Sequence, residues 1–395
     1  MSDSKAQTTR PIFLDYQATT PTDPRVVEAM LPYFNEDFGN PHSMYHLYGR
    51  DAAEAVGRAR AQIAALIGAE AREIVFTSGA TESNNLAIKG ACRFLAGRKG
   101  HLITLASEHK CVLESCKRME REGYRLTLLD PGPDGLIEPA RIAAAIEEDT
   151  ALVSVMAVNN EIGVIQPLAE IGALCRERGV LFHCDAAQAA GKIPLDVNEM
   201  SIDLLSLSGH KMYGPKGIGV LYIRRRPRVR LEPLFDGGGQ ERGHRSGTLP
   251  APLCIGLGRA AEIASAEMAE EAERLAGFSA RFRALLEAGI EGVQVNGSLE
   301  ARFAGNLNVS IPGVAAEALL EAMPEVAVST GSACTSASVE PSYVLRALGL
   351  PEARARGSLR IGFGRFTTEV EVERAAEIMV AAARRLRGRA SAAAE

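Results

Sequence analysis

The sequence predicts an α/β protein with a large domain, built on a mostly parallel sheet flanked by helices, and a smaller α/β C-terminal domain. Short β-rich runs alternate with segments of helical period from about residue 57 to 223, which is typical of crossover units on a parallel sheet. The β-rich runs are apolar enough to be buried on both faces. After residues 245–248 the alternation stops, and a long Ala/Glu/Arg helix near 258–287 precedes a mixed region that ends near 381.

The expected elements of the large domain follow one another along the chain. Residues 78–82 open an amphipathic helix that runs to Phe94, and another helix runs through Val112 and Met119. Strands are expected at 73–77, 101–106, 152–158, 180–184, 204–207 and 218–223. The carboxyl ends of strands in open α/β sheets are where ligands bind, so residues just past these strands are candidates for a site. The residues after Arg389 carry no fold signal.

Composition and charge exclude several classes of protein. The chain has 395 residues, of which 46% are hydrophobic and 24% charged, so disordered, collagen-like and coiled-coil proteins are excluded. The 44 Lys and Arg against 49 Asp and Glu give a net charge of −5, which lacks the footprint of a direct nucleic-acid binder. No uncharged apolar run reaches the roughly 18 residues of a membrane span, and residues 1–10 lack the apolar segment of a signal peptide. We therefore expect a soluble cytoplasmic protein with no membrane partner.

The cysteines indicate a reducing compartment. Their number is odd and no C-x-x-C pair is present, so neither a disulfide framework nor a zinc knuckle is expected. The seven are Cys92, Cys111, Cys116, Cys175, Cys184, Cys254 and Cys334. The first four lie on predicted helices, where we expect small packing or surface roles.

Lys211 lies in the most informative short string, SGHKMYGPKG at 208–217. It follows a predicted strand in a chain where only eight of the 44 basic residues are Lys. A desolvated Lys can lose its proton and bind a carbonyl covalently, which Arg cannot do. The alternative is a solvated loop lysine. An S-x-x-K enzyme is disfavoured because no S-D-N or K-T-G follows, and the glycines precede a strand instead of a helix, which excludes a dinucleotide-binding fingerprint.

Further positions complete a pattern around Lys211. Asp185 ends a predicted strand, where a carboxylate can keep a pyridine nitrogen protonated. The turn at 78–81 offers backbone N–H groups, the Thr81 hydroxyl and a positive helix end to a phosphate. His109, past another strand, can stack on a ring or carry protons. Each alone has an ordinary explanation as a turn residue, a helix N-cap or a partly buried His. Together, at the ends of successive strands, they predict a pyridoxal 5'-phosphate site.

Nine strings of the chain resemble one enzyme family. They are LDYQATTP (14–21), GNPHS (39–43), FTSGATESNN (76–85), SEHK (107–110), NNEIGVIQP (159–167), HCDAAQ (183–188), SGHKMYGPKG (208–217), GGGQERGHRSGT (237–248) and GSACTSASVEPSYVLRALG (331–349). In this order, over about residues 12–370, the chain resembles the cysteine desulfurases of iron–sulfur cluster assembly, within the class V aminotransferase family of pyridoxal phosphate fold type I. The resemblance implies a large cofactor-binding domain at 16–262 and a small domain at 1–15 and 263–395.

The resemblance also implies roles around the cofactor. Lys211 would carry the pyridoxal phosphate covalently, Asp185 would pair with its ring nitrogen, and Gln188 would bind its ring hydroxyl. His109 would stack on the ring and move protons. The residues around the phosphate would be Ala80, Thr81, Ser208 and His210, with Thr248 supplied by the other subunit of a homodimer.

The same resemblance assigns two residues to the substrate. Asn160 would contact both the cofactor and the substrate. Arg360 would bind the α-carboxylate of L-cysteine, because a guanidinium makes two parallel hydrogen bonds to a carboxylate where Lys cannot. Lys211, once freed from the cofactor by the substrate, would move the α-proton.

Cys334 separates a desulfurase from an aminotransferase. It lies in 329–338, ten residues with no bulky and no charged side chain, a composition that favours mobility. The resemblance implies that its thiolate attacks the sulfur of L-cysteine and keeps it as a persulfide while L-alanine leaves; the proton acceptor is His109 or the substrate. The alternative is a loop cysteine without a role. Cys334 is also a candidate for a transient iron–sulfur ligand, in a complex only, since one cysteine makes no metal site.

The implied acceptors of the sulfur are an iron–sulfur scaffold protein and carriers for tRNA thiolation, with frataxin-like and ferredoxin proteins as further partners. The run RRRPRVR at 224–230 is either a solvated loop or a docking patch for such acidic proteins. Three other functions stay open: a selenocysteine lyase, an aminotransferase-like relative that would not need Cys334, and a catalytically silent binding platform. The joint presence of Lys211, Asp185 and Cys334 argues against the platform.

Overall fold

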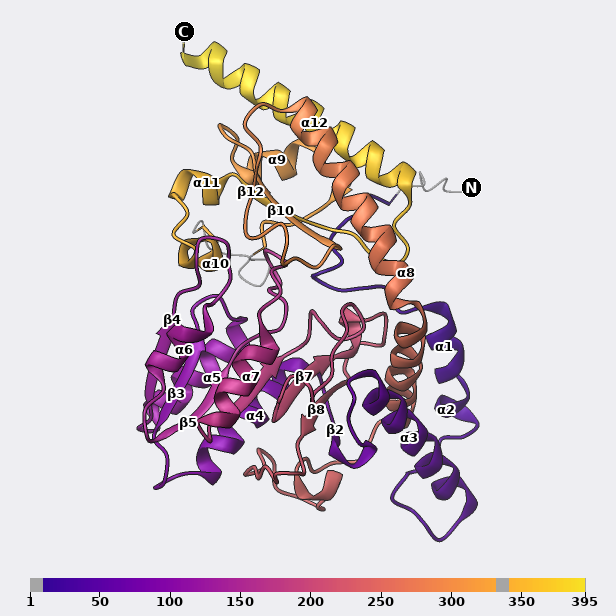
Figure 1. Cartoon of the computed structure of the whole chain (residues 1–395). Helices are drawn as coiled ribbons and strands as arrows, with labels where there is room; N and C mark the ends of the chain where they lie inside the picture. The colour runs from indigo at the N-terminus through magenta and orange to yellow at the C-terminus, as the bar shows by residue number, and fades with distance from the viewer. Residues whose placement is uncertain (1–9, 332–340, 395) are drawn as a thin grey trace.

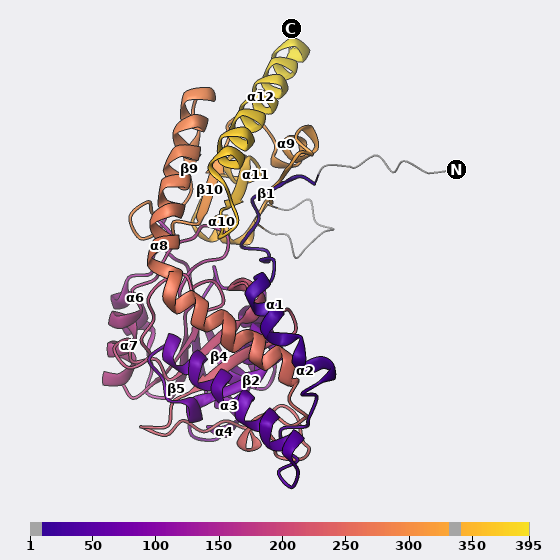
Figure 2. The ribbon, with the colours of Figure 1, turned by 90° about the vertical axis from the view of Figure 1, so that its right-hand side faces the viewer.

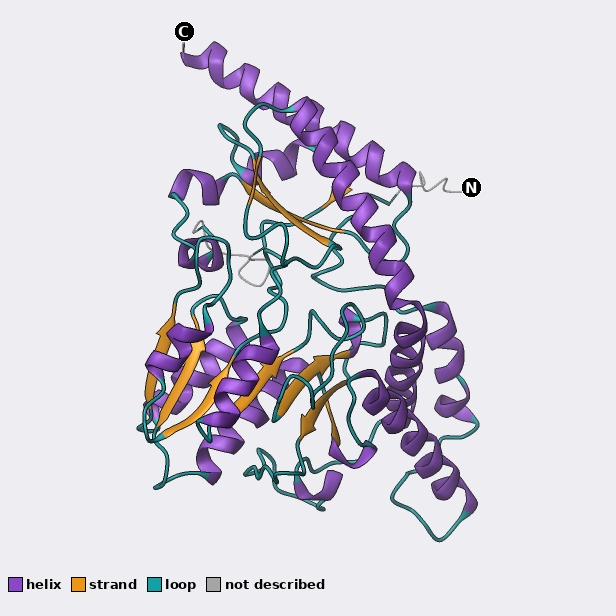
Figure 3. Ribbon diagram, in the orientation of Figure 1, coloured by secondary structure: helices purple, strands orange, loops and turns teal. Residues whose placement is uncertain are grey.

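A computed structural model describes residues 10–331 and 341–394 of the chain and shows two regions of different architecture (Figure 1). One region is built on a sheet of seven strands, and the other on a sheet of three strands. The C-terminal helix belongs to the smaller region and lies at the end of the molecule away from the large sheet (Figure 3). The predicted fold class, with a large and a small α/β part, is confirmed.

The large sheet is mostly parallel. In order across the sheet, its strands are β2 (Ile74–Thr77), β8 (Gly219–Ile223), β7 (Leu204–Ser208), β6 (Leu181–Asp185), β5 (Thr150–Ser154), β3 (His101–Leu105) and β4 (Arg125–Leu129). β8 runs antiparallel to β2 and β7, and the pairs from β7 to β4 are parallel. β2 and β7, which flank β8, therefore point the same way. The carboxyl ends of β2, β3, β5, β6 and β7 meet at one edge of the sheet.

Helices cover both faces of this sheet, which explains its apolar strands. They are α3 (Leu47–Leu66), α4 (Ala80–Phe94), α5 (Lys110–Arg121), α6 (Pro139–Ala145), α7 (Leu168–Glu177) and α8 (Ala251–Gly289), with short 3-10 turns η1 (Ala71–Glu73), η2 (Gly209–Lys211) and η3 (Glu241–Gly243). The short helices α1 (Pro24–Met30) and α2 (Pro32–Asn35) pack on α8 instead. Successive strand residues alternate between the faces. Val75 and Leu102 pack with apolar residues of α4 and α5, whereas their neighbours Phe76 and Ile103 join the core that includes α3, α7 and α8.

Two strands differ from the sequence prediction. β5 covers Thr150–Ser154 instead of 152–158, because residues 155–158 are equally buried and apolar although the strand has ended. β4 is absent from the prediction. It lies at the sheet edge beside β3, and its residues are exposed or half-buried, so it lacks the continuous apolar run of the central strands.

The smaller region is antiparallel at its centre. β10 (Asn306–Ser310) lies between β12 (Ser358–Gly362) and β9 (Gln294–Val295), and its helices are α9 (Ala316–Ala322), α10 (Tyr343–Ala347), α11 (Glu352–Arg356) and α12 (Glu369–Ala394). β1 (Ile12–Phe13) pairs in parallel with β11 (Val326–Ala327), which joins the N-terminal residues to this region. The division at residues 16 and 262 stays a prediction.

The long helix α8 connects the two regions. It packs against α1 and α3 of the large region and against α12 of the smaller one (Figure 2). The expected helix at 258–287 is confirmed and extends further at both ends. α12 also continues to Ala394, past Arg389, where the sequence alone gave no fold signal.

Membrane-spanning helices, metal sites and disulfides were not expected from the sequence. Within residues 10–331 and 341–394, no helix is long and apolar enough to cross a membrane. In the same described part, no group of three or more His, Cys, Asp and Glu side chains is arranged to hold a metal ion. The cysteines there, from Cys92 to Cys254, are free thiols.

Candidate active site

A cavity of about 670 Å³ lies at the carboxyl edge of the large sheet, where this edge faces the smaller region. Ten residues that the sequence analysis assigned to the site line it: Ala80, Thr81, His109, Asn160, Asp185, Gln188, Ser208, His210, Lys211 and Arg360. Thr248 is exposed and does not line this cavity. Cys334 lies outside the described residues, and Gly331, the last described residue before it, lines the cavity.

Strand ends bring most of these residues together. Asp185 is the last residue of β6, and Ser208 is the last residue of β7. η2 follows β7 at once and carries Lys211. His109 comes shortly after β3 as the N-cap of α5, and α4 begins with Ala80 shortly after β2. Since these strands point the same way, residues that follow their carboxyl ends lie at the same edge of the sheet.

The Lys211 amine is held by two backbone carbonyls. Its Nζ donates to the carbonyl oxygens of Gln17 at 2.5 Å and Ala18 at 2.7 Å. The segment around Gln17 is far away in the sequence but lines the same cavity, and the sequence analysis did not assign it to the site. The amine is therefore held at the cavity wall while its side chain stays only half-buried.

The Asp185 carboxylate is fixed on both oxygens. Oδ1 accepts a hydrogen bond from the backbone N–H of Ala187 at 2.9 Å, and Oδ2 accepts one from Nδ2 of Asn84 at 2.7 Å. Asn84 lies on α4, and nothing in its sequence position distinguished it from a surface helix residue. Its amide also donates to Sγ of Cys111 at 3.1 Å. The carboxylate thus has a set orientation toward the cavity that it lines.

His109 has a defined tautomer. Its Nδ1 accepts a hydrogen bond from the backbone N–H of Cys111 at 3.2 Å, so the neutral ring carries its proton on Nε2. Burial lowers the pKa of the imidazole, although the Asp185 carboxylate acts in the opposite sense. Cys111 lies 3.0 Å from the same nitrogen and lines the cavity, and it also packs against the apolar cluster under α4 and α5, as expected for a packing residue. Burial raises its pKa to about 12, which keeps it a thiol.

The first turn of α4 lines the cavity. Gly79 has no side chain to cap that turn, and its backbone approaches β8 so closely that a Cβ on Gly219 would lie 2.5 Å from the Cα of Gly79. Helix N–H groups favour an anion. Ser208 and His210 line the same cavity, and Thr19 Oγ1 lies 3.0 Å from Nδ1 of His210. Burial and nearby lysines lower the pKa of His210 to about 4, so the ring is neutral at pH 7.

The side of the cavity opposite the sheet comes from the smaller region. Arg360 lies on β12, is 3% exposed, and donates from Nη2 to Oδ1 of Asp15 at 2.8 Å and from Nη1 to the carbonyl of Asn160 at 2.9 Å. Among the described residues, its Nε and the Oδ1 of Asn160 are buried without a hydrogen-bond partner. Unpartnered buried polar atoms are costly, so these two are available to a ligand. The sequence analysis did not find Asp15.

The basic run is not uniformly a surface loop. Arg224 is buried, and its guanidinium bonds to the carbonyl of Ile202 and pairs with Asp203 at 3.3 Å. Arg225, Arg226, Arg228 and Arg230 are exposed. The expectation of a solvated loop is therefore wrong for the first arginine of the run.

The fold and the site agree with a known family. The sequence pattern of the family described as "Aminotransferase class-V" matches residues 12–375. The chain belongs to this family. It covers nearly the whole length of proteins named cysteine desulfurase: it is 57% identical to "Cysteine desulfurase IscS" of Rickettsia bellii, over 95% of this chain and 92% of that protein. The same name is carried by a protein of Rickettsia massiliae that is 56% identical, over 96% of this chain and 92% of the relative.

Solved structures give the same result. A structure titled "NIFS-LIKE PROTEIN" superposes with a TM-score of 0.88 at 34% identity, covering 94% of this chain and 98% of that one. "SspA in complex with cysteine" superposes with a TM-score of 0.79 at 41% identity, covering 90% and 99%. The resemblance to the cysteine desulfurases within the class-V family is confirmed.

Proposed function

We propose that this protein is a cysteine desulfurase that uses pyridoxal 5'-phosphate to convert L-cysteine to L-alanine and passes the sulfur, as a persulfide on Cys334, to acceptor proteins for iron–sulfur cluster assembly. One observation carries the proposal. The cavity gathers Lys211, Asp185, His109 and Arg360 in a chain that is more than half identical to proteins named cysteine desulfurase.

The residues of the cavity fit this cofactor. The Lys211 amine is suited to covalent attachment, and the oriented Asp185 carboxylate is suited to a ring N–H. The turn of α4 at Ala80 and Thr81, with Ser208 and His210, is suited to a phosphate. When bound, pyridoxal phosphate would supply an electron sink that acidifies the α-proton of an amino acid.

The protein's own groups bind the substrate and move its protons. The Arg360 guanidinium binds the α-carboxylate, because it offers N–H groups in a fixed fork and has an unpartnered Nε. Lys211, whose amine is held at the cavity wall, takes the α-proton and returns it. His109, neutral and protonated on Nε2, is able to donate one proton on the cavity side.

The sulfur step balances without an external oxidant. A thiolate at Cys334 forms an S–S bond with the substrate sulfur, and the C–S bond breaks. The electron pair of that bond stays with the three-carbon fragment, which takes up a proton and leaves as L-alanine. Sulfur is oxidised to the persulfide level and carbon is reduced by the same two electrons.

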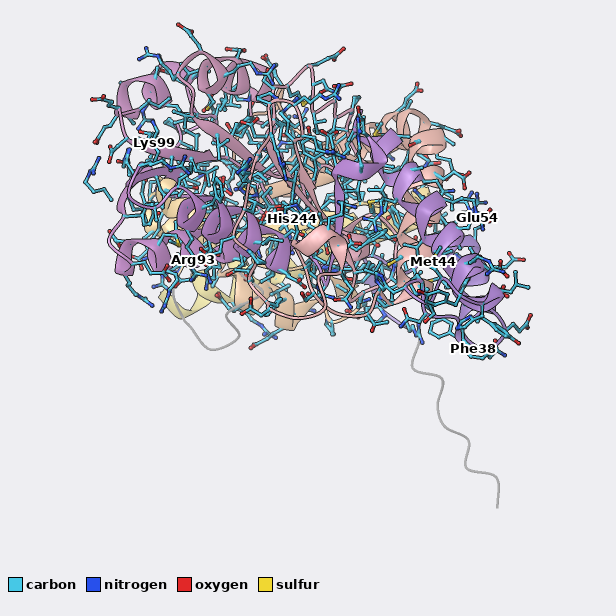
Figure 4. All side chains as sticks on the ribbon, turned by 90° about the horizontal axis from the view of Figure 1, so that it is seen from below. Phe38, Met44, Glu54, Arg93, Lys99 and His244 are labelled. Carbon is cyan, nitrogen blue, oxygen red and sulfur yellow. The ribbon has the colours of Figure 1, made fainter. Side chains whose placement is uncertain are left out.

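A homodimer is the proposed assembly. An apolar patch (Phe34, Phe38, Met44, Tyr45, Leu47 and Tyr48) is exposed on α2, α3 and the loop between them, and Phe38 and Met44 lie at the same side of the molecule in Figure 4. Phe38 is 64% exposed and its ring stacks on Tyr48. Contiguous exposed aromatic surface indicates an interface. The exposed Thr248 would then reach the phosphate of the second subunit.

Sedimentation velocity tests the dimer. Phe38→Asp combined with Tyr45→Asp should give a monomer that retains pyridoxal phosphate poorly. Val370→Asp is the matched control, because Val370 is a 76% exposed apolar residue on α12, outside the patch. A double variant that stays dimeric would contradict the proposed interface.

The proposed partners are acidic proteins in the cytoplasm: an iron–sulfur scaffold protein, frataxin-like and ferredoxin proteins, and carriers for tRNA thiolation. The support is a basic patch (Arg225, Arg226, Arg228 and Arg230) at the surface. Reversing Arg225 and Arg228 to Glu should weaken such binding at low salt and leave turnover of L-cysteine unchanged. Equal binding of wild type and variant would remove the patch from the proposal.

The function is tested with purified protein and L-cysteine. We expect a visible absorption band that shifts when L-cysteine is added, and release of alanine and sulfide in the presence of a thiol reductant. Cys334→Ser should lose the sulfide while keeping the band. A variant that still turns over would favour an aminotransferase-like enzyme, a protein active on selenocysteine only would be a lyase of that amino acid, and a protein that binds no cofactor would be a binding platform.

A further inference from the structure

Lys192 is a buried lysine beside the cavity that the mechanism does not use. It lies in the turn that follows β6, is 8% exposed, and its amine lies 5.4 Å from the centre of the Phe303 ring. Its Nζ donates to Oε1 of Gln188 at 2.9 Å. Burying an ammonium that donates a hydrogen bond to a neutral amide costs free energy, so a specific task for this group is to be expected.

Two contacts, with Lys192 and with the carbonyl of Gln17, set the orientation of the Gln188 amide. An ammonium group only donates hydrogen bonds, so the oxygen of Gln188 must face Lys192. The NH₂ group then faces the other way, and Nε2 donates to the carbonyl of Gln17 at 2.8 Å. The same carbonyl accepts from Lys211 at 2.5 Å. The amide has a second N–H, and Gln188 lines the cavity.

The surroundings of Lys192 place the titration of its amine close to neutral pH. Burial lowers its pKa to about 7, and the positive charges of Lys211 and Arg360 act in the same direction, whereas Glu271 acts against them. Lys192 is therefore charged at mildly acidic pH and partly neutral above pH 7. A neutral amine no longer enforces the orientation of the Gln188 oxygen.

We propose that Lys192 is a positioning residue that holds Gln188 as a hydrogen-bond donor toward a negatively charged ring oxygen of the cofactor. The inference rests on the proposed function, because it needs pyridoxal phosphate in the cavity. Without Lys192 only the Gln17 carbonyl holds the amide, so its second N–H is no longer fixed toward the ring oxygen. That oxygen keeps a neighbouring proton more tightly, since it loses both a donor and a positive charge nearby.

Lys192→Met tests the proposal, because Met keeps the length of the stem and packs well on Phe303. The readout is the pH at which the visible band of the cofactor-loaded protein titrates. We expect the midpoint to rise by about one pH unit, equivalent to the loss of one hydrogen bond to a charged group. Lys192→Arg, which keeps charge and donors, should restore the wild-type midpoint. Lys117→Met, at a half-buried lysine on α5, should leave it unchanged.

Thermal unfolding of the cofactor-free proteins separates this role from a structural one. A purely structural Lys192 predicts a lower Tm for Lys192→Met with an unchanged midpoint, and that result overturns the inference. The positioning role predicts an equal or higher Tm, since replacing a buried charge by an apolar side chain is often stabilising, together with the shifted midpoint.

A second variant tests the positioning role of Lys192 if Lys192→Met does not fold. Gln188→Glu places a carboxylate opposite Lys192 that cannot donate to the ring oxygen, and it should raise the midpoint in the same direction. An unchanged midpoint in Gln188→Glu overturns the inference. If the wild-type protein binds no pyridoxal phosphate, both the proposed function and this inference are wrong. If the wild-type band is normal and its pH midpoint is unchanged in both variants, only this inference is wrong.

Discussion

The two walls of the cavity hold their polar groups in different ways. The sheet wall (Thr81, His109, Asp185, Ser208 and Lys211) consists of side chains at the ends of successive elements, and Asp185 and His109 are fixed by N–H groups two residues further along the chain. The opposite wall (Asn160 and Arg360) is assembled from distant segments, with Asp15 and Glu161 near Arg360 but outside the cavity lining, and the pair Arg360–Asp15 spans 345 residues. The sheet wall is thus set by local structure, whereas the opposite wall exists only when the two regions are docked.

The two walls of the cavity have different proposed roles in the reaction. In the proposed function, the groups that hold the cofactor and move protons lie on the sheet wall, where rigid strands fix them. The groups proposed to recognise the substrate lie on the opposite wall, where their position depends on the packing of the smaller region. Substitutions on the sheet wall should therefore reduce kcat, and those on the opposite wall should alter KM, stability or pH dependence.

The largest effect is expected at Lys211. Lys211→Ala removes the covalent attachment and the group that moves the α-proton, so alanine formation from L-cysteine should fall by roughly 10³-fold or more. Lys117→Ala, at a half-buried lysine on α5, is the matched control and should be fully active. A loss of less than about tenfold in Lys211→Ala would assign the chemistry to another group.

A smaller effect is expected at Arg360, with a different kinetic signature. Arg360→Lys keeps the charge near Asp15 but loses the two-pronged contact with a carboxylate. We expect KM for L-cysteine to rise by roughly 10- to 100-fold, the equivalent of one charged hydrogen bond, with a lesser change in kcat. Steady-state kinetics of alanine release separates the change in KM from the change in kcat. A change confined to kcat would mean that Arg360 acts on the sheet-wall chemistry instead.

Glu161 should give the opposite wall a pH-dependent stability. Burial raises the pKa of its carboxyl from the ordinary 4.5 to about 6, against the hydrogen bond from Ser342 and the charge of Arg360. A raised carboxyl pKa means that the folded state favours the protonated form. Its contribution to stability is therefore full below pH 4.5 and is lost as the pH rises through 6.

Glu161→Gln has no carboxyl that titrates, so it tests whether Glu161 makes the stability depend on pH. Relative to wild type, the unfolding free energy of the cofactor-free variant should increase by about 2 kcal/mol between pH 4.5 and pH 7, as measured by urea denaturation. Ser342→Ala, which removes the donor and keeps the carboxyl, should retain the titration. Parallel pH profiles for wild type and Glu161→Gln would show that the carboxyl does not titrate in this range.

The smallest effect is expected at Cys111 on the sheet wall. The backbone N–H of Cys111 already sets the tautomer of His109, and this bond survives in Cys111→Ala. Turnover should change by no more than about threefold, because a weak thiol hydrogen bond is lost. A large loss with a displaced pH profile of kcat would show that the thiol itself holds the proton arrangement of His109.

The same difference explains what could be predicted from the sequence. The sheet wall was predictable because a functional residue past a strand end is visible as a local string, as for Lys211 after β7 and Asp185 in β6. The central strands were predictable because both faces are buried. β4 was missed because an edge strand is neither fully buried nor uniformly apolar.

Residues of the site that act through long-range contacts left no local signal. Asp15, Gln17 and Asn84 reach the site through partners that lie about a hundred residues or more away, and Lys192 reads as a solvated turn lysine until its burial is known. Arg224 is similar, since its burial depends on the loop near Ile202. The roles assigned to Thr248 and Cys334 stay predictions, Thr248 because it faces outward and Cys334 because it lies outside the described residues.

In the proposed function, this cavity removes sulfur from L-cysteine and delivers it to Cys334. The most direct test is a single turnover without reductant, followed by mass spectrometry of the peptide that contains Cys334 and measurement of free alanine. We expect one added sulfur atom on Cys334 for each alanine released, and neither product in Lys211→Ala. Alanine without sulfur on Cys334, or sulfur on Cys111 instead, would contradict it.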